Sequence, residues 1–207
     1  MMLIEWYGHS CFKITSRDYS IALDPYNPNM INGLGNYHIE ADAVYCSHEH
    51  GDHNYKPAVT LSGKPDKGVF KINFIETFHD EESGQKRGRN KITMLESDGI
   101  KVAHMGDLGC DLSKSQINTL KNLDALMIPI GGYYTIDAHK AKAICDVLKP
   151  RVIIPMHYRG DGFGPAVIAT KESFTELYQK TYIVKYDSNI IEVNSSTINQ
   201  VAILKYR

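Results

Sequence analysis

The chain lacks three features that would each point to a particular class of protein. No apolar run approaches the roughly 20 residues that a membrane-spanning helix needs. No Cys-x-x-Cys pair occurs and the four cysteines are far apart, so neither a thiolate zinc site nor a disulfide framework is indicated. The formal net charge of −1 gives no electrostatic reason to expect a nucleic-acid partner, although a local basic patch is not excluded by it.

The N-terminus also lacks a targeting signal. Its first five residues, Met-Met-Leu-Ile-Glu, have neither the basic segment nor the apolar core of a secretory leader. Unpaired thiols are the simplest account of the separated cysteines, and they suit a reducing compartment. We therefore expect a cytoplasmic protein with no membrane association.

The composition is that of an ordinary globular protein, and the order of expected elements indicates its class. The 207 residues are 43% apolar and 23% charged, and we expect residues 1–207 to form a single domain. Many strands with interspersed helices indicate two packed sheets with helices outside, a layered α/β arrangement. Helices are expected at 113–123, 137–148 and 173–180, and strands at 3–7, 11–15, 20–23, 43–46, 69–78, 91–96, 100–104, 124–129, 151–155, 182–186, 190–193 and 201–204.

The most informative segment is Ser47-His48-Glu49-His50-Gly51-Asp52-His53, which directly follows an apolar run. It holds three of the nine histidines of the chain. Imidazole and carboxylate side chains together suit Zn, Fe or Mn, and a strand that leads into a glycine-containing turn gives such ligands a rigid base. A solvated polar loop is the alternative, but such loops are built mainly from Ser, Asn, Asp and Gly. The segment therefore predicts a metal site.

Three further candidate ligands stand at the ends of expected strands. His79, Asp107 and His157 each close an apolar stretch, with glycine or proline near the exit. A single residue of this kind is more often a capped or hydrogen-bonded structural residue. Together with the histidine-rich segment, however, the three share one arrangement, a His or Asp at the end of an apolar strand. This arrangement indicates a site with more than one metal ion.

In this order, His48-x-His50-x-Asp52-His53, His79, Gly106-Asp107 and His157 resemble the ligand pattern of the metallo-β-lactamase fold superfamily. The resemblance extends over nearly the whole chain. Within the superfamily, the chain is similar to a branch of small cytoplasmic zinc-dependent hydrolases related to L-ascorbate-6-phosphate lactonase.

The resemblance implies a fold, a ligand set and a cofactor. The fold is a four-layer αβ/βα sandwich with the metals at one sheet edge, and the cofactor is two zinc ions, with manganese or iron as alternatives. The first metal would be held by His48, His50 and His79, and the second by Asp52, His53 and His157, with Asp107 bridging both.

A pair of metals at such a site defines a reaction type. Two metals roughly 3.5–4 Å apart can share a water and lower its pKa from ~15.7 towards ~7. The bridging hydroxide attacks a carbonyl carbon or phosphorus, and Asp52 can orient the water and accept its proton. No Gly-x-Ser-x-Gly motif is present to supply a serine nucleophile. We therefore predict a dinuclear metal-dependent hydrolase that acts on a small anionic ester, lactone or phosphodiester.

Four residues outside the ligand pattern have candidate roles in the site. Asp24 could accept a hydrogen bond from a ligand imidazole or from the ligand loop, or could simply cap the turn before a proline. The resemblance places His9 near the metals, although a structural histidine is equally open. Arg87, in the loop after His79, could grip an anionic group, and the Tyr133 hydroxyl could donate to a developing oxyanion. A solvated loop and a packed aromatic rim are the respective alternatives.

Two other functions could use the same scaffold. A di-iron redox protein is one, but no flavodoxin-like domain or thiol partner motif accompanies the ligands. A metal-dependent nuclease is the other, and the near-neutral charge argues against it. The expected partner is a small anionic substrate.

Overall fold

The structure, a computed structural model, describes residues 1–206. Its helical segments are α1 (Lys114–Thr119), α2 (Ala138–Leu148) and α3 (Glu172–Thr175), with short 3-10 turns η1 (Pro28–Met30), η2 (Lys56–Ala58) and η3 (Lys180–Tyr182). Its strands are β1 (Met2–Gly8), β2 (Cys11–Ser16), β3 (Tyr19–Leu23), β4 (Ile39–Ala41), β5 (Ala43–Tyr45), β6 (Val59–Leu61), β7 (Lys71–Phe78), β8 (Arg89–Ser97), β9 (Ile100–His104), β10 (Ala125–Pro129), β11 (Val152–Met156), β12 (Ile183–Lys185), β13 (Ile190–Val193) and β14 (Gln200–Ile203).

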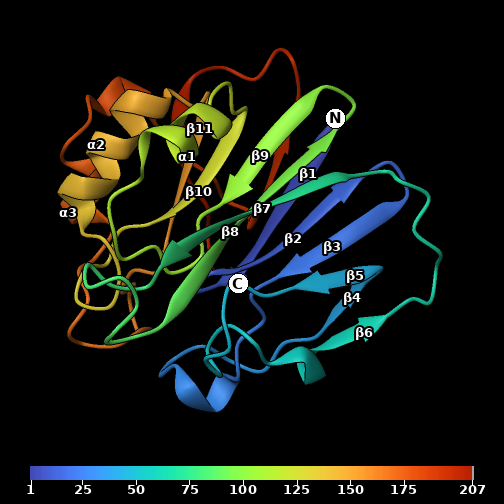
Figure 1. Ribbon diagram of the computed structural model, residues 1–207, viewed down its shortest axis with the longest axis horizontal. Helices are drawn as coiled ribbons and strands as arrows, with labels where there is room; N and C mark the ends of the chain where they lie inside the picture. The colour runs from blue at the N-terminus through green and yellow to red at the C-terminus, as the bar shows by residue number, and fades with distance from the viewer. Residues whose placement is uncertain (207) are drawn as a thin grey trace.

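The strands form two main sheets packed against each other (Figure 1). One sheet has five strands in the order β13-β1-β2-β3-β5, and the other has seven in the order β12-β14-β11-β10-β9-β8-β7. The seven-stranded sheet is parallel from β9 to β12 and antiparallel from β7 to β9. A small third sheet pairs β4 with β6.

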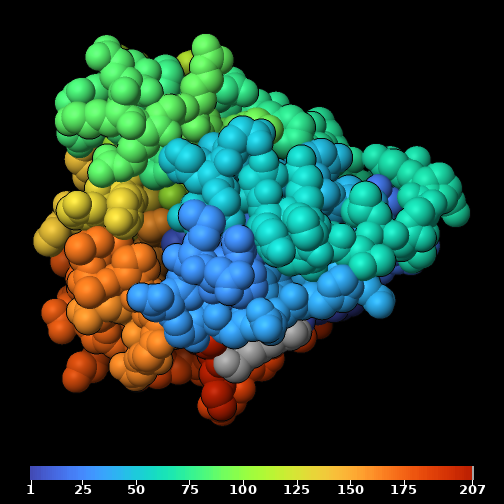
Figure 2. Space-filling model, turned by 90° about the horizontal axis from the view of Figure 1, so that it is seen from below, coloured from blue at the N-terminus to red at the C-terminus, as the bar shows by residue number. Residues whose placement is uncertain are grey.

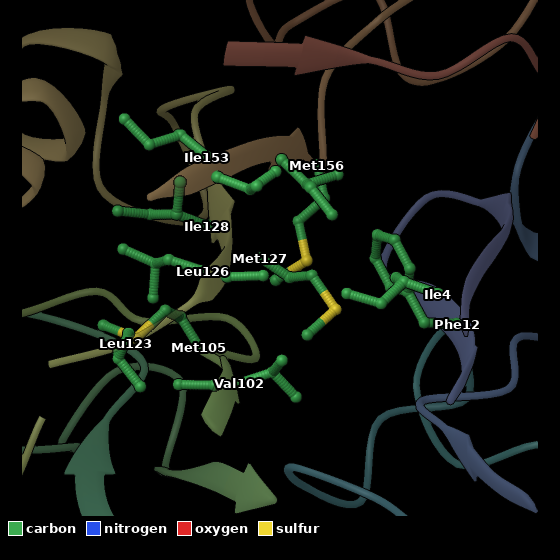
Figure 3. Packing of buried hydrophobic residues seen from close by; sticks show 14 of the residues in the cluster. Ile4, Phe12, Val102, Met105, Leu123, Leu126, Met127, Ile128, Ile153 and Met156 are labelled. Carbon is green, nitrogen blue, oxygen red and sulfur yellow. The ribbon is translucent and has the colours of Figure 1, made fainter. Parts of the chain in front are cut away.

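The core lies between the two main sheets. Ile4 and Phe12 of the five-stranded sheet point toward Met127 and Met156 of the seven-stranded sheet (Figure 3), and all four are fully buried. Because side chains alternate across a strand, the neighbours Leu126 and Ile128 point to the opposite face, where they are also buried. A sheet buried on both faces explains why β10 and β11 are continuous apolar runs.

The three α-helices cover the outer face of the seven-stranded sheet (Figure 1). Helix α2 begins at Asp137, whose side chain accepts a hydrogen bond from the Lys140 amide, and ends where Lys149 adopts a φ of 50°. The outer face of the five-stranded sheet is covered instead by the segment that contains η1 and β4. Among residues 1–206, no helix has both the length and the apolar character to cross a bilayer.

Most expected elements are present, and the differences have physical causes. The expected helix 113–123 starts with a capping box at Ser113 but ends at Thr119, since Asn122 adopts a φ of 59° and turns the chain toward β10. The expected helix 173–180 is only α3, because Leu177 and Tyr178 continue it with tighter i to i+3 hydrogen bonds. Strands β4 and β6 were not expected.

The strand directions bring the exits of several strands to one edge. Strands β9, β10 and β11 run parallel, so the residues that follow them emerge at the same edge of the sheet. Strands β3 and β5 are parallel in the other sheet. In the view from below, the loops that follow these strands gather on one face, where blue, cyan, green and yellow segments lie side by side (Figure 2).

Candidate metal centre

The histidines and carboxylates expected as ligands lie at these strand exits. His48 follows β5, His79 follows β7, Asp107 follows β9 and His157 follows β11. His9 follows β1 in the same way. Ligands that are fixed at strand ends have little freedom, which is what a preorganised metal site requires.

One group of potential ligand atoms comes from His48, His50 and His79. One nitrogen from each lies within 4.8 Å of the others. The ring centroids are 4.6 Å apart for His48 and His50, and 4.8 Å apart for His48 and His79. His50 is exposed, whereas His79 is buried, so this group opens toward solvent on one side.

A second group consists of His9, Asp52, His53 and His157, again with ligand atoms within 4.8 Å of one another. The three histidines are buried, and the Asp52 side chain is 30% exposed. The sequence placed Asp52, His53 and His157 together, and the structure adds His9, whose ring centroid lies 4.2 Å from that of His157.

Asp107 lies between the two groups and is 1% exposed. Its Oδ2 atom is 3.2 Å from His79 Nε2 in the first group, and 3.1 Å and 3.2 Å from His53 and His157 Nε2 in the second. A single carboxylate therefore faces both sets of imidazoles.

The donor atoms in this cluster fit a metal better than they fit each other. His9, His48 and His53 have buried Nε2 atoms without a hydrogen-bond partner, and Asp107 Oδ1 is likewise unpartnered. Leaving such groups unsatisfied costs about 1–3 kcal/mol each. Their convergence at one point is explained if they bind cations, and imidazole with carboxylate suits Zn, Mn or Fe.

Asp24 orients one candidate ligand in each group, His53 by a direct hydrogen bond and His48 through the Ser47 hydroxyl. Its Oδ2 accepts hydrogen bonds from His53 Nδ1 at 2.7 Å and from the Ser47 hydroxyl at 2.6 Å. The Ser47 hydroxyl in turn lies 2.9 Å from His48 Nδ1. Because Nδ1 carries the proton in both cases, Nε2 of His48 and of His53 is left free to bind a metal. The hydrogen bonds expected of Asp24, to a ligand imidazole and to the ligand loop, are both present.

Asn90 supports Asp107 in a comparable way. It is fully buried, and its Oδ1 accepts a hydrogen bond from the Asp107 amide at 2.9 Å. Its amide nitrogen donates to Thr77 Oγ1 and to the Met105 carbonyl oxygen. The backbone at Gly106, directly before Asp107, passes close to the Asn90 side chain. A Cβ on Gly106 would lie 2.3 Å from Asn90 Oδ1, so glycine is required there.

Three residues of the centre have left-handed backbone conformations. His9, Asp24 and His157 have φ values of 50°, 47° and 52°. Such conformations cost on the order of 1–3 kcal/mol each for residues other than glycine, and they cluster at functional sites. The fold therefore holds these three residues in a backbone conformation that residues other than glycine disfavour, and this fixes the positions of their side chains.

The two groups differ in their protonation. Burial and the nearby His53 lower the pKa of His48 to about 3. Burial alone would lower the pKa of His53 as well, but Asp107 and Asp24 on its two nitrogens raise it well above the usual value. Burial and His157 lower the pKa of His9 to about 4. Of these three histidines, His53 is therefore the one that carries protons on both ring nitrogens at pH 7 in the absence of metal.

The loop and turn residues lie at the mouth of the centre. Arg87 and Tyr133 both line a cavity beside His79, while Arg89 does not. Tyr133 is 64% exposed, and it is the next residue, Tyr134, that lies near the ligands, with its ring centroid 6.5 Å from that of His157. His104, which is outside the ligand set, is buried, and its Nε2 is hydrogen-bonded to the Ser10 carbonyl oxygen.

Residues 3–157 match the family model described as the Beta-lactamase superfamily domain. The chain belongs to the metallo-β-lactamase superfamily. It is 30% identical over 189 residues to a UPF0173 protein of Pyrococcus abyssi, an alignment that covers 80% of this chain and 87% of that protein. A UPF0173 metal-dependent hydrolase of Lawsonia intracellularis is 28% identical, over 83% and 88% of the two chains.

A solved structure of a Thermotoga maritima protein, assigned as a Zn-dependent hydrolase of this superfamily, has a TM-score of 0.77 and 30% identity, and the alignment covers both chains completely. The chain is thus a metal-dependent hydrolase of the superfamily, and the expected α/β sandwich is confirmed. The relation to L-ascorbate-6-phosphate lactonase stays a prediction.

Three supporting residues were not recognised in the sequence. Ser47 was considered only as the start of the histidine-rich segment, and Asn90 was not considered. Of the two neighbouring tyrosines, only Tyr133 was assigned a role. Ser47 carried a signal in its position directly before the first candidate ligand. Asn90 also had one, because the register of the expected strands 91–96 and 100–104, which pairs Ser97 with Ile100, continues so that Asn90 lies opposite Asp107.

Proposed function

We propose that the protein is a dinuclear metal-dependent hydrolase of small anionic esters, lactones or phosphodiesters. His48, His50 and His79 would hold the first metal, Asp52, His53 and His157 the second, and Asp107 would bridge them. The observation that carries this proposal is the position of Asp107 Oδ2, within 3.2 Å of imidazole nitrogens from both groups.

Bound metals would supply Lewis acidity and a water whose pKa is lowered toward neutrality. The protein's own contribution is to fix the ligands and to handle protons. Asp52 is the exposed carboxylate of the cluster, with Oδ2 3.6 Å from His9 Nε2. Burial alone would raise the pKa of Asp52, but the contact with His9 and the charge of His53 hold it below the usual value. Asp52 is therefore ionised near pH 7, and we assign it the orientation of the reacting water.

The size of the site supports a small substrate. The cavity that reaches His79 has a volume of about 280 Å³. Larger hollows of about 460 Å³ beside α2 and about 710 Å³ beside β12 contain none of the candidate ligands, so we do not assign the reaction to them. We assign His9 a contact with a substrate oxygen at the second group, because its Nε2 lies 3.6 Å from Asp52 Oδ2.

The experiment that tests the proposal is metal analysis of the purified protein. We expect close to two equivalents of zinc, manganese or iron, and a metal-free native protein would contradict the proposal. The zinc, manganese and iron forms are then assayed on a phosphodiester, a lactone and a thioester. Hydrolysis of one class by one metal form identifies both the bond and the working metal.

The two alternative functions have direct tests but no supporting observation. The tRNase Z of human and the β-hydroxylase CmlA share only the fold, at 9% and 12% identity. A visible absorption band with native iron would favour a redox protein, and tight, salt-sensitive RNA binding would favour a nuclease.

A further inference from the structure

The cavity beside His79 connects the metal centre to two loops. One wall is the loop that follows His79, up to Arg87, and the opposite wall is the turn 132–137 that follows β10. The lining of the cavity therefore combines one candidate ligand with residues that have no part in the ligand set. A substrate bound at the metals would place its unreactive end here.

All but one of the charged side chains in this cavity have a hydrogen-bond or ion-pair partner among the described residues, and the four carboxylates of the cavity outnumber its three cations. The partnered ones are Asp80 with four backbone amides, Glu81 with Lys140, Glu82 with Lys86, and Asp137 with the Lys140 amide. Arg87 is the exception: within residues 1–206 its guanidinium has no carboxylate partner, and its one contact is with an aromatic ring. Among the cations of the cavity, Arg87 is thus the one that no carboxylate of the described residues neutralises.

The position of Arg87 is fixed by the residue that follows the ligand His79. Asp80 Oδ2 accepts hydrogen bonds from the amides of Arg87 at 2.8 Å and Lys86 at 3.1 Å, while Oδ1 binds the amides of Glu82 and Gly84. The loop is therefore closed around a single carboxylate. Because Asp80 directly follows His79, the backbone of Arg87 is held relative to the metal centre.

The side chain of Arg87 is positioned by Tyr134. The guanidinium carbon lies 5.6 Å from the centroid of the Tyr134 ring, and that ring lies 6.5 Å from the His157 ring. An arginine that packs on an aromatic face keeps its N–H groups available for a planar or tetrahedral anion. Tyr134 thus spans the distance between the free cation and the ligands.

We propose that Arg87 is a specificity residue that binds an oxyanion, a carboxylate or a phosphate, carried by the substrate away from the bond that is hydrolysed. This inference rests on the proposed hydrolase function, since the reacting end of the substrate must lie at the ligands. Asp80 and Tyr134 are positioning residues for Arg87. Arg89, two residues further on, lies outside the cavity and has no such role.

The test is calorimetric binding of three probes to the metal-containing protein. Butyrate has one carboxylate, glutarate has a second one at the far end, and 4-phosphonobutyrate has a phosphonate there. We expect glutarate or 4-phosphonobutyrate to bind about tenfold or more tightly than butyrate, because a charge-assisted hydrogen bond is gained. Tighter binding of glutarate would indicate a substrate with a distal carboxylate, and tighter binding of 4-phosphonobutyrate would indicate one with a distal phosphate.

The variants assign that advantage to one side chain. Arg87→Met should reduce the ratio of the affinity of the dianionic probe to that of butyrate to about one. Arg87→Lys should keep part of this ratio, since lysine keeps the charge but cannot make the bidentate contact. Arg89→Met, which removes the same charge two residues away, should keep the full advantage. Equal binding of all three probes by the unaltered protein, or an advantage that survives Arg87→Met, overturns the proposal.

The same measurements separate a failure of this proposal from a failure of the dinuclear site. If the metal site is wrong, the purified protein lacks metal and butyrate does not bind. If only the Arg87 site is wrong, metal is present and butyrate binds, but the distal anion adds nothing.

Discussion

The two ligand groups of the metal centre are built differently, although they share Asp107. The group of His48, His50 and His79 is open, with His50 exposed at the mouth. The group of His9, Asp52, His53 and His157 is closed, since all three imidazoles are buried and His53 is hydrogen-bonded from behind by Asp24. If two metals bind as proposed, this difference predicts a firmly held ion in the closed group and an ion with room for substrate in the open one.

Protonation follows the same division. In the open group His48 has its pKa lowered to about 3 by burial and by His53, and the pKa of His50 is lowered as well, mainly by burial. In the closed group the carboxylates of Asp107 and Asp24 raise the pKa of His53 despite its burial. The open group is therefore ready to take a metal at pH 7, whereas the closed group must first release a proton.

The largest effect should come from removing what the groups share. Asp107→Ala should abolish binding of both ions and lower kcat/KM by at least about 10³-fold, roughly 4 kcal/mol. Metal content and the activity on the substrate found by screening measure this. Asp111→Ala is the matched control, because the Asp111 side chain lies four residues away and is 89% exposed. Retention of two equivalents by the Asp107 variant would contradict the bridging role.

Removing one histidine from each group should have the same effect on metal content but different effects on the stability of the metal-free protein. His50→Ala and His53→Ala should each reduce the metal content by about one equivalent. Only His53→Ala should also destabilise the metal-free protein, by about 3–5 kcal/mol, because it removes an imidazole that contacts both buried carboxylates, Asp24 and Asp107. Urea unfolding in chelator measures this, and equal unfolding midpoints for the two variants would remove the distinction between the groups.

Substitution of Asp24 or Ser47, which hydrogen-bond the candidate ligands, should weaken metal binding less than substitution of a ligand. Asp24→Asn should weaken metal binding by about 10–100-fold, the usual effect of losing a partner of a ligand imidazole. Ser47→Ala should weaken mainly the open group and by less, since Ser47 contacts only His48 and Asp24 directly. Competition with a chromogenic chelator measures both affinities. An Asp24 variant with unchanged affinity would show that Asp24 is only a turn residue.

Proton release should distinguish the groups directly. Filling the closed group should release about one proton from His53 at pH 7, and filling the open group should release none from His48. Below the raised pKa of His53, affinity at the closed group should fall about tenfold per pH unit, whereas His48 does not compete with metal until about pH 3. Titration calorimetry in two buffers of different ionisation enthalpy, on His50→Ala and Asp52→Ala variants, tests this.

The smallest effect is expected for His9. If it contacts the substrate, His9→Ala should lower kcat/KM about tenfold, the value of one hydrogen bond, while the metal content stays near two equivalents. A drop to one equivalent would instead make His9 a fifth protein ligand of the second metal, after Asp52, His53, His157 and Asp107. Metal analysis of the variant therefore decides between the two roles.

The ligand candidates named from the sequence come together in the structure, and metal binding by them stays a prediction. They could be named from the sequence because metal binding restricts residue types so strongly. Few segments other than a metal site have a reason to contain His48, His50 and His53 together, and strand-end positions pointed to His79, Asp107 and His157. The expected strands were found within two residues at each end, since alternation and turn residues mark them. The three-residue strands β4 and β6 were missed because their pairing depends on chain segments about 20 residues apart.

The sequence by itself determined which atoms could bind metal, since donor chemistry belongs to single residues and is preserved in any fold. The resemblance had already divided those atoms into two groups, but only the tertiary structure decided that one group is open and the other closed. That difference depends on Asp24 reaching both His53 and Ser47, on Asn90 holding the Asp107 amide, and on His9 joining the cluster from another strand. It likewise left Arg87 as the unpaired cation of the cavity, because charge balance is a property of neighbours in space and not along the chain.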